Sequence, residues 1–213
     1  LAILSNWEEG DEMKTLFLCS YFTDVASLFK TFADQNQFEK KVLFIPTAGN
    51  VEEYTAYIDE ARAVFADLQF EVEVLDIAEA REDVVREKIS QTPCLYISGG
   101  NTFYLLQELK KKNLLPLIRE RIHQGMVYLG ESAGAIIASR DIFYNHIMDD
   151  KNLAPGLTEY SALSMVDFFV LPHWKEFPFE ESSQQTAAAY DGQLKLLKLT
   201  NQQAVLVTGH TNV

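Results

Sequence analysis

Residues 126–138 read MVYLGESAGAIIA and join two apolar segments through a serine flanked by glycines. The first segment is short and partly β-branched, which predicts a buried strand, and the second is compatible with a helix. Ser132 has a glycine two residues before it and another two residues after it, the spacing of a nucleophile elbow. In such a turn the serine is strained, and a side chain at Gly130 or Gly134 would collide with the neighbouring strand or helix. We therefore predict that the turn lifts the Ser132 hydroxyl clear of a sheet, at the N-terminus of a helix.

Strand and helix signals alternate on both sides of this turn. Short apolar or alternating runs predict strands at residues 15–22, 41–46, 71–77, 94–98, 126–129, 166–171 and 204–208. Helical spacing and composition predict helices at residues 25–32, 51–68, 81–90, 103–112, 117–123 and 180–192. Near-continuous apolar strands separated by amphipathic helices are typical of sheets covered on both faces. The sequence therefore predicts a three-layer α/β fold with a mainly parallel, doubly wound sheet.

Length and composition fit a single α/β domain over residues 1–213. Hydrophobic residues make up 47% of the chain and charged residues 23%, which is ordinary for a globular protein. Residues 1–12 are mixed and acidic, and Met13-Lys14 resembles a more natural start. We expect residues 1–12 to be an N-terminal extension that packs poorly.

Charge and cysteine usage narrow the possible partners and location. The net charge of −13 argues against nucleic acid or an anionic membrane as a partner, since both reward clusters of Lys and Arg. No stretch approaches the roughly 18 apolar residues of a membrane helix, and the N-terminal residues lack the layout of a signal peptide. Cys19 and Cys94 lie in apolar runs, which predicts buried free thiols rather than a disulfide. We expect a cytoplasmic location.

Three polar segments each follow the end of a predicted strand: Gly99-Gly100, Ser132 and His173. In open parallel sheets ligands bind beyond the carboxyl ends of the strands, so the three segments can meet at one edge. A serine hydroxyl needs a base to take its proton, and histidine suits that role near neutral pH. His173, which ends an apolar strand, is the best candidate, with a buried structural histidine as the alternative. Solvated, capping or loop positions are expected for the others: His123, His146 and His210.

The backbone N–H groups of Gly99, Gly100 and Asn101 precede a predicted helix and resemble an anion-binding nest. Together with the N–H of Ala133 they could stabilise the oxyanion of a tetrahedral intermediate. A tight turn in which Asn101 caps the following helix is a second interpretation, and it is compatible with the first.

These segments carry a family resemblance. Gly99-Gly100-Asn101-Thr102-Phe103, Gly130-x-Ser132-Ala133-Gly134-Ala135 and Pro172-His173 occur in the order and approximate spacing of the dipeptidase E family of serine peptidases. That family includes aspartyl dipeptidases and cyanophycinases, and the resemblance extends from Lys14 to about Thr208.

The resemblance implies a flavodoxin-like fold, like that of class I glutamine amidotransferases, with a serine in place of the nucleophilic cysteine. It also implies a serine hydrolase that cleaves a small peptide after an N-terminal acidic residue. Carried over by position, Ser132 is the nucleophile, His173 the general base, and Gly100 with Ala133 the oxyanion hole.

The chain departs from this family in its third triad member, an Asp or Glu whose position, counted without gaps, falls at residues 147–150. Asp149 or Asp150 could therefore orient His173. The alternative is two solvated loop carboxylates and a Ser–His dyad, in which nothing fixes the imidazole tautomer.

A second departure concerns substrate recognition. Members of the family carry an arginine-bearing segment after the histidine that suits a substrate carboxylate, whereas residues 180–189 contain no cation. Glutamine does not replace a bidentate arginine, so specificity for an N-terminal Asp is doubtful. Asn101 and Glu131 remain candidates for substrate binding. Glu131 could favour a free amino group on the substrate, or it could be a surface-pointing or salt-bridged glutamate.

We expect a serine-type peptidase of short peptides that is a monomer or homodimer and uses no cofactor. No metal site is expected, since His and Asp or Glu never take zinc-ligand spacing. The alternative is a catalytically weak or inactive homologue that binds a small amino-acid or peptide ligand. A glutamine amidotransferase is the least favoured option, because neither cysteine lies near Ser132.

Overall fold

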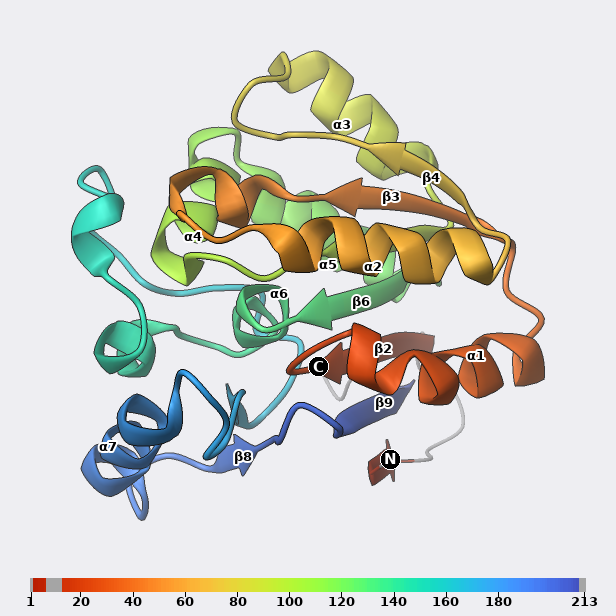
Figure 1. Cartoon of the computed structure of the whole chain (residues 1–213). Coiled ribbons are helices and arrows are strands. Elements are labelled where there is room, and N and C mark those ends of the chain that lie inside the picture. The colour runs from red at the N-terminus through yellow and green to blue at the C-terminus, as the bar shows by residue number, and fades with distance from the viewer. Residues whose placement is uncertain (1, 7–12, 211–213) are drawn as a thin grey trace.

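Seven strands form one central sheet within residues 2–6 and 13–210, which the computed structural model describes (Figure 1). Their order across the sheet is β1-β9-β2-β6-β5-β3-β4. The pairs are parallel except for β2 with β9, so the sheet is mainly parallel, as predicted. The strands are β1 (Ala2–Asn6), β2 (Met13–Cys19), β3 (Lys41–Ile45), β4 (Glu71–Val74), β5 (Cys94–Ile97), β6 (Val127–Glu131) and β9 (Ala204–His210).

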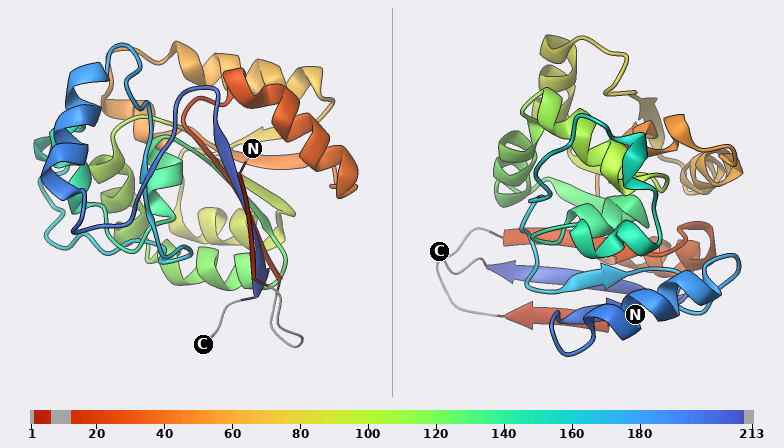
Figure 2. Two further views of the ribbon diagram at one scale, coloured as in Figure 1. Left: turned by 90° about the horizontal axis from the view of Figure 1, so that it is seen from below. Right: turned by 90° about the vertical axis from the view of Figure 1, so that its left-hand side faces the viewer.

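Helices cover both faces of this sheet (Figures 1 and 2). One face carries α1 (Ala26–Gln35) and α2 (Ala56–Asp67), whose Phe29 and Phe65 belong to an aromatic-rich core. The other face packs on a larger, mostly aliphatic core formed with α3 (Glu82–Gln91), α4 (Thr102–Lys111), α5 (Leu114–His123) and α6 (Ala133–Ile137). This arrangement confirms the three-layer, doubly wound, flavodoxin-like fold. None of the helices in the described ranges is long and apolar enough to cross a membrane.

Side chains of the central strands alternate between the two cores, as the pleat of a strand requires. In β2, Leu16 and Leu18 face the aliphatic core, whereas Phe17 and Cys19 face the aromatic one. All four are buried, so the strand reads as a continuous apolar run in the sequence. Cys19 and Cys94 are both buried and free, which confirms the prediction for the thiols.

The segment after β3 differs from the predicted helix at residues 51–68. A 3-10 turn, η2 (Thr47–Val51), comes first, Glu52 is extended, and α2 begins only at Ala56. Tyr54 extends the apolar helical spacing in the sequence, yet its side chain is 65% exposed. The side chain of Tyr54 lines a cavity, yet its position in the sequence fits the spacing of an apolar helix face, so the predicted helix begins too early.

A smaller parallel sheet pairs β7 (Phe169–Leu171) with β8 (Leu196–Lys198), and α7 (Glu180–Tyr190) lies between them in the chain. The sequence prediction omits β8, because its three residues are only half-buried. The polar stretch after α6 forms two 3-10 turns, η3 (Phe143–Ile147) and η4 (Lys151–Leu153). Another 3-10 turn, η1 (Thr23–Val25), precedes α1.

Residues 1–12 were predicted to be an extension that packs poorly, and β1 corrects this prediction for residues 2–6. Residues 2–6 pair with β9 in parallel register, from Ala2 with Val205 to Asn6 with Gly209. This pairing uses backbone groups of β9 that would otherwise lie at the edge of the sheet. The rest of the expected extension, residues 1 and 7–12, lies outside the described residues.

Candidate active site

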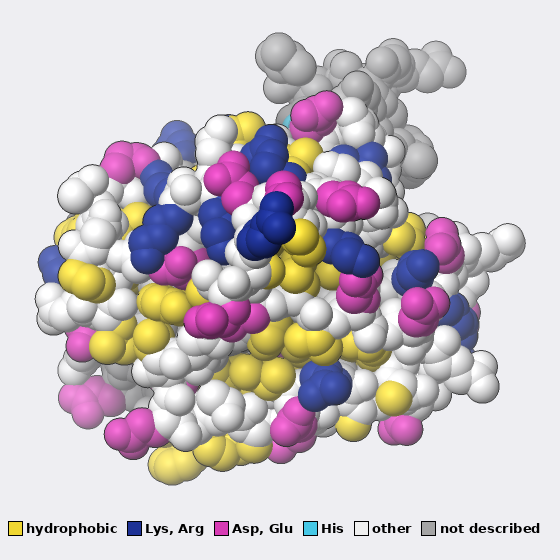
Figure 3. All heavy atoms as spheres, turned by 90° about the horizontal axis from the view of Figure 1, so that it is seen from above, with side chains coloured by type: hydrophobic (Ala, Val, Ile, Leu, Met, Phe, Trp, Pro, Cys, Tyr) yellow, Lys and Arg dark blue, Asp and Glu magenta, His cyan; other side chains and the backbone are white. Residues whose placement is uncertain are grey.

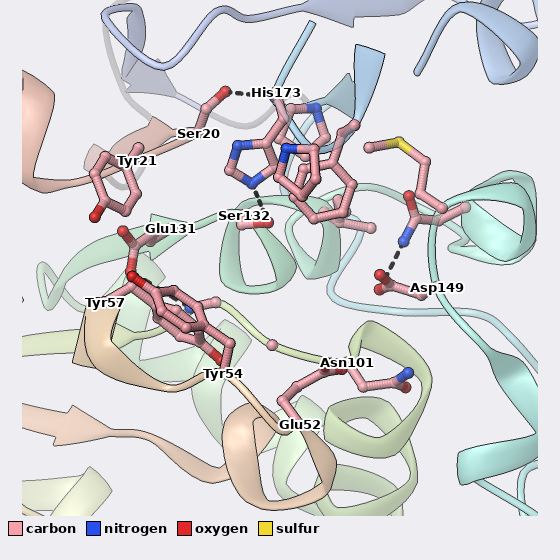
Figure 4. A pocket seen from close by; sticks show the side chains of 18 of the residues that line it. Ser20, Tyr21, Glu52, Tyr54, Tyr57, Asn101, Glu131, Ser132, Asp149 and His173 are labelled. Atoms are coloured by element: carbon pink, nitrogen blue, oxygen red, sulfur yellow. Dashed lines mark hydrogen bonds between the residues drawn. The ribbon is translucent and has the colours of Figure 1, made fainter. Parts of the chain in front are cut away.

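A cavity of about 730 Å³ opens where β5 and β6 end. The segments predicted to meet at one sheet edge all line it: Gly99-Gly100, Ser132 and His173 (Figure 4). This is the position expected for a ligand site in a parallel sheet, beyond the carboxyl ends of the strands. Its other walls come from the loop after β2, residues 52–57, the loop after α6 and the segment before α7.

Ser132 joins β6 directly to α6 in a strained backbone conformation, with φ 45° and ψ −105°. A Cβ atom on Gly130 would lie 2.5 Å from the carbonyl oxygen of Gly134. A Cβ atom on Gly134 would lie 2.2 Å from the carbonyl oxygen of Ile97 in β5. Both positions therefore require glycine. The Ser132 N–H donates to the carbonyl of Cys19 at 2.9 Å, which ties the turn to β2.

His173 and Ser132 are within hydrogen-bonding distance, with 2.9 Å between Nε2 and Oγ. His173 follows β7 and also has a positive φ, 53°. Its N–H donates to the hydroxyl of Ser20 at 3.1 Å, and that hydroxyl donates to the carbonyl of Leu199. Its ring stacks on Phe179, with 4.8 Å between centroids and 22° between planes. The imidazole is thus held from the backbone side and from one ring face.

The other imidazole nitrogen contacts a residue that sequence reasoning missed, Asn201. The distance from Nδ1 of His173 to Oδ1 of Asn201 is 2.7 Å. An amide oxygen only accepts, so Nδ1 carries the hydrogen and the lone pair of Nε2 faces Ser132. Burial lowers the pKa of His173, while the Asn201 hydrogen bond and the charge of Glu176 act in the opposite direction. The one sequence signal for Asn201 is its place in a turn shortly after β8, the strand that was not predicted.

Asp149 and Asp150 do not orient His173, which corrects the hypothesis of an acidic third member. Oδ2 of Asp149 accepts from the N–H of Thr102 at 2.9 Å and from Nδ2 of Asn145 at 2.8 Å. The Asp150 carboxylate accepts from the N–H of Asn152 at 2.9 Å. The 3-10 turns direct this loop to the first turn of α4, and Figure 4 shows Asp149 well apart from His173. Burial raises the pKa of Asp149 to about 6.

The glycine pair after β5 has two different roles. Gly100 has φ +125°, and a Cβ atom there would lie 2.3 Å from the carbonyl of Ala48, so only glycine fits. The N–H of Gly99 donates to Oε2 of Glu131 at 3.4 Å, so this donor is already used within the protein. Gly99 is therefore a poor candidate for the oxyanion hole. Gly100 and Ala133, the residue that begins α6, remain the candidate donors.

Glu131 is 1% exposed and lies beneath the turn. Its carboxylate accepts from the N–H of Phe22 at 2.7 Å and from the Tyr96 hydroxyl at 2.6 Å, in addition to Gly99. Burial raises its pKa to about 7, and these hydrogen bonds act in the opposite direction. Among the described residues it has no ion pair, so neither a surface-pointing nor a salt-bridged glutamate is found. Glu131 braces three segments that meet under Ser132.

Asn101, the other candidate for substrate binding, lines the cavity but is held by the protein itself. Its side-chain oxygen accepts from the N–H of Tyr104 at 2.9 Å, which caps α4 as anticipated. Its Nδ2 donates to the carbonyl of Asp150 at 3.1 Å. In the described part of the chain, no group of three or more His, Cys, Asp or Glu side chains could hold a metal ion.

Known proteins resemble this chain over most of its length. A family model, peptidase family S51, matches residues 16–212. An uncharacterized peptidase of Pasteurella multocida (strain Pm70) is 42% identical over 201 residues, which span 94% of this chain and 97% of that protein. Peptidase E of Nostoc sp. (strain PCC 7120) is 28% identical over 167 residues, 76% of this chain and 66% of that protein. The crystal structure of a candidate peptidase E from Listeria monocytogenes EGD-e superposes with TM-score 0.86 at 40% identity, covering 94% of this chain and all of that one.

Proposed function

The chain belongs to peptidase family S51, and from this premise we propose that it hydrolyses short peptides through an acyl-enzyme on Ser132, with His173 as general base. Peptidase activity of the serine type follows from the family and its relatives. The roles of individual residues are our proposal. The observation that carries it is the 2.9 Å contact between Oγ of the strained Ser132 and Nε2 of His173, inside a cavity at the sheet edge.

In the first half of the reaction, Oγ of Ser132 attacks the carbonyl carbon of the peptide and its proton passes to Nε2 of His173. The N–H groups of Gly100 and Ala133 stabilise the negative oxygen of the tetrahedral intermediate. The carbon–nitrogen bond then breaks, and His173 returns the proton to the leaving amine. In the second half, water attacks the ester, His173 takes a proton from the water, and the acid leaves as Ser132 is protonated again.

Asn201 is proposed to fix the tautomer in which Nδ1 of His173 carries the hydrogen. Unlike a carboxylate, its amide adds no negative charge to stabilise the imidazolium that forms during the attack. The triad is therefore Ser132–His173–Asn201, with orientation but little electrostatic assistance from its third member.

The size of the cavity supports short substrates, since about 730 Å³ is within the usual range for small-molecule sites. A dipeptidase-like activity is accordingly proposed. The free, buried state of Cys19 and Cys94 is compatible with the cytoplasmic location that we also propose.

A fluorophosphonate probe combined with a dipeptide library tests the proposal. We expect the wild type to be labelled and to release amino acids, and Ser132→Ala to lose both properties while keeping its melting temperature within a few degrees. Ser90→Ala, at an exposed serine on α3, is the matched control and should behave as the wild type. A wild type that does not react with the probe, but whose melting temperature rises with amino acids, would instead favour the ligand-binding homologue.

A further inference from the structure

The walls of the cavity carry four carboxylates from three separate segments: Glu52, Glu131, Asp149 and Asp150. Lysine and arginine are absent from the lining residues of the described chain. The acids lie close enough to influence one another, because Glu52 contributes to the raised pKa of Asp149, after burial. With its pKa near 6, Asp149 is mostly charged at pH 7.

The cations that adjoin the cavity in sequence are directed elsewhere. Nζ of Lys151 lies 5.5 Å from the ring centroid of Phe143, and Nζ of Lys175 lies 5.3 Å from that of Trp174. On the face of the molecule shown in Figure 3, which is the view from above in Figure 1, lysine and arginine side chains are interspersed with acidic ones. A carboxylate on the first side chain of the substrate, placed beside the acids of the cavity, would lose hydration without gaining a counterion.

An unpaired acceptor gives independent evidence that the cavity takes a hydrogen-bond donor. Asn145 is 1% exposed and lines the cavity. Its Nδ2 donates to Asp149 and to Thr102, but its Oδ1 has no partner within the described residues. A buried acceptor without a partner is costly, so native structures usually satisfy it with water or a ligand. A donor beside Asn145 would satisfy its Oδ1 and would lie next to the carboxylate of Asp149.

Two tyrosine rings, those of Tyr54 and Tyr57, line the same cavity as the carboxylates. Tyr54 and Tyr57 lie with 6.1 Å between their ring centroids, and Figure 4 shows them near Glu52, with Asp149 on another side of the cavity. The Tyr57 hydroxyl also has no partner within the described part of the chain. Carboxylates combined with aromatic faces attract ammonium groups through charge and through the ring quadrupole.

Resting on the proposed function above, we infer that this site selects peptides that carry positive charge into the cavity. Its substrates have an unblocked terminal ammonium and a neutral or basic first side chain, and peptides beginning with Asp or Glu are rejected. The same hydrolytic machinery thereby serves a substrate class different from that of an aspartyl dipeptidase.

The test compares kcat/KM for Lys-Ala, Asn-Ala and Asp-Ala at pH 7, where the terminal amino group is mostly protonated and Asn and Asp differ in charge but hardly in shape. We expect Asn-Ala and Lys-Ala to exceed Asp-Ala by about tenfold or more, because the cavity carboxylates repel a negatively charged side chain that has no counterion there. N-acetylation of Asn-Ala should lower its kcat/KM to a similar degree. Fastest cleavage of Asp-Ala, or indifference to acetylation, would overturn the inference.

Two variants assign the effect to the cavity. Glu52→Gln should reduce the preference for Lys-Ala over Asp-Ala several-fold, whereas Glu53→Gln should not, since Glu53 is exposed on the same segment but does not line the cavity. Equal effects of both substitutions would contradict the assignment. Binding of the same peptides to Ser132→Ala, measured by calorimetry, keeps the question separate from catalysis. If hydrolysis fails, a ranking of Lys-Ala above Asp-Ala in binding still supports the inference, and the reverse ranking refutes it.

Discussion

Replacing Asn201 by aspartate tests how the imidazole of His173 is controlled. The substitution keeps the shape of the side chain but places a negative charge 2.7 Å from Nδ1. An adjacent carboxylate raises a histidine pKa by about 1–3 units, or about 1.4–4 kcal/mol in favour of the charged ring. Because His173 must be neutral to accept the proton of Ser132, the acid limb of the pH profile should move to higher pH by the same number of units.

The wild-type limb gives the reference for this shift. Burial lowers the pKa of His173 below the ordinary 6.5, so the wild type should remain active below that pH. Asn201→Asp should lose activity there but be at least as fast as the wild type at high pH, where the new charge stabilises the imidazolium formed during attack. Asn201→Ala leaves the Nδ1–H without a partner, which costs about 1–3 kcal/mol, so kcat/KM should fall by about 5- to 150-fold at pH values where His173 is neutral.

The assay is kcat/KM for one dipeptide between pH 5 and pH 9, fitted to the apparent pKa of the free enzyme. Gln202→Glu is the matched control, because it adds the same charge at the next, exposed position. An acid limb that lies at the same pH in Asn201→Asp, Gln202→Glu and the wild type would refute the role of Asn201. So would an Asn201→Ala variant with full activity.

Two further predictions concern stability. Ser132→Gly should be inactive yet up to about 2.5 kcal/mol more stable to urea than Ser132→Ala, because glycine relieves a backbone strain of about 1–3 kcal/mol that alanine retains, less an entropic cost of about 0.5–1 kcal/mol. A Ser132→Gly variant that is less stable than Ser132→Ala would show that the turn is not strained. Burial raises the pKa of Glu131 from 4.5 to about 7, because the folded protein disfavours the charged carboxylate. The contribution of Glu131 to the unfolding free energy is therefore fully present below pH 4.5 and is lost as the pH rises through 7. Relative to Glu131→Gln, the wild type should lose roughly 2–3 kcal/mol of unfolding free energy between pH 5 and pH 8, and parallel urea-denaturation curves for the two proteins would contradict this.

The sheet and its covering helices could be predicted because buried positions are apolar and recur with the period of a strand or a helix. Strands β2, β3, β5 and β6 are buried on both faces, so each appears as an apolar run. The predictions were wrong or incomplete where this apolar pattern is weak. β8 is short and half-buried. Between residues 52 and 55, the aromatic side chain of Tyr54 lines the cavity and does not belong to the core. Pairing of β1 with β9 depends on a free strand edge, which no local pattern reveals.

In the candidate site, Ser132 and His173 could be found because glycine spacing and strand ends mark them. Asn201 could not, because an asparagine in a turn has many ordinary roles and its partner lies 28 residues away in the chain. Counting residues from Ser132 led instead to Asp149 and Asp150. That count transfers the spacing of the dipeptidase E family without gaps, whereas in this chain η3 and η4 place Asp149 against the first turn of α4.

Backbone conformation explains why part of the site can be predicted from the sequence and part cannot. Ser132 and His173 both have positive φ, a conformation that non-glycine residues rarely adopt. At Ser132 the surrounding glycines permit it, and they leave a motif. At His173 the conformation is held by Ser20, Phe179 and Asn201, none adjacent to it in sequence. The nucleophile is therefore positioned by local sequence and its base by tertiary contacts, so a change at Ser20 or Asn201 can misalign the pair while leaving the glycine motif intact.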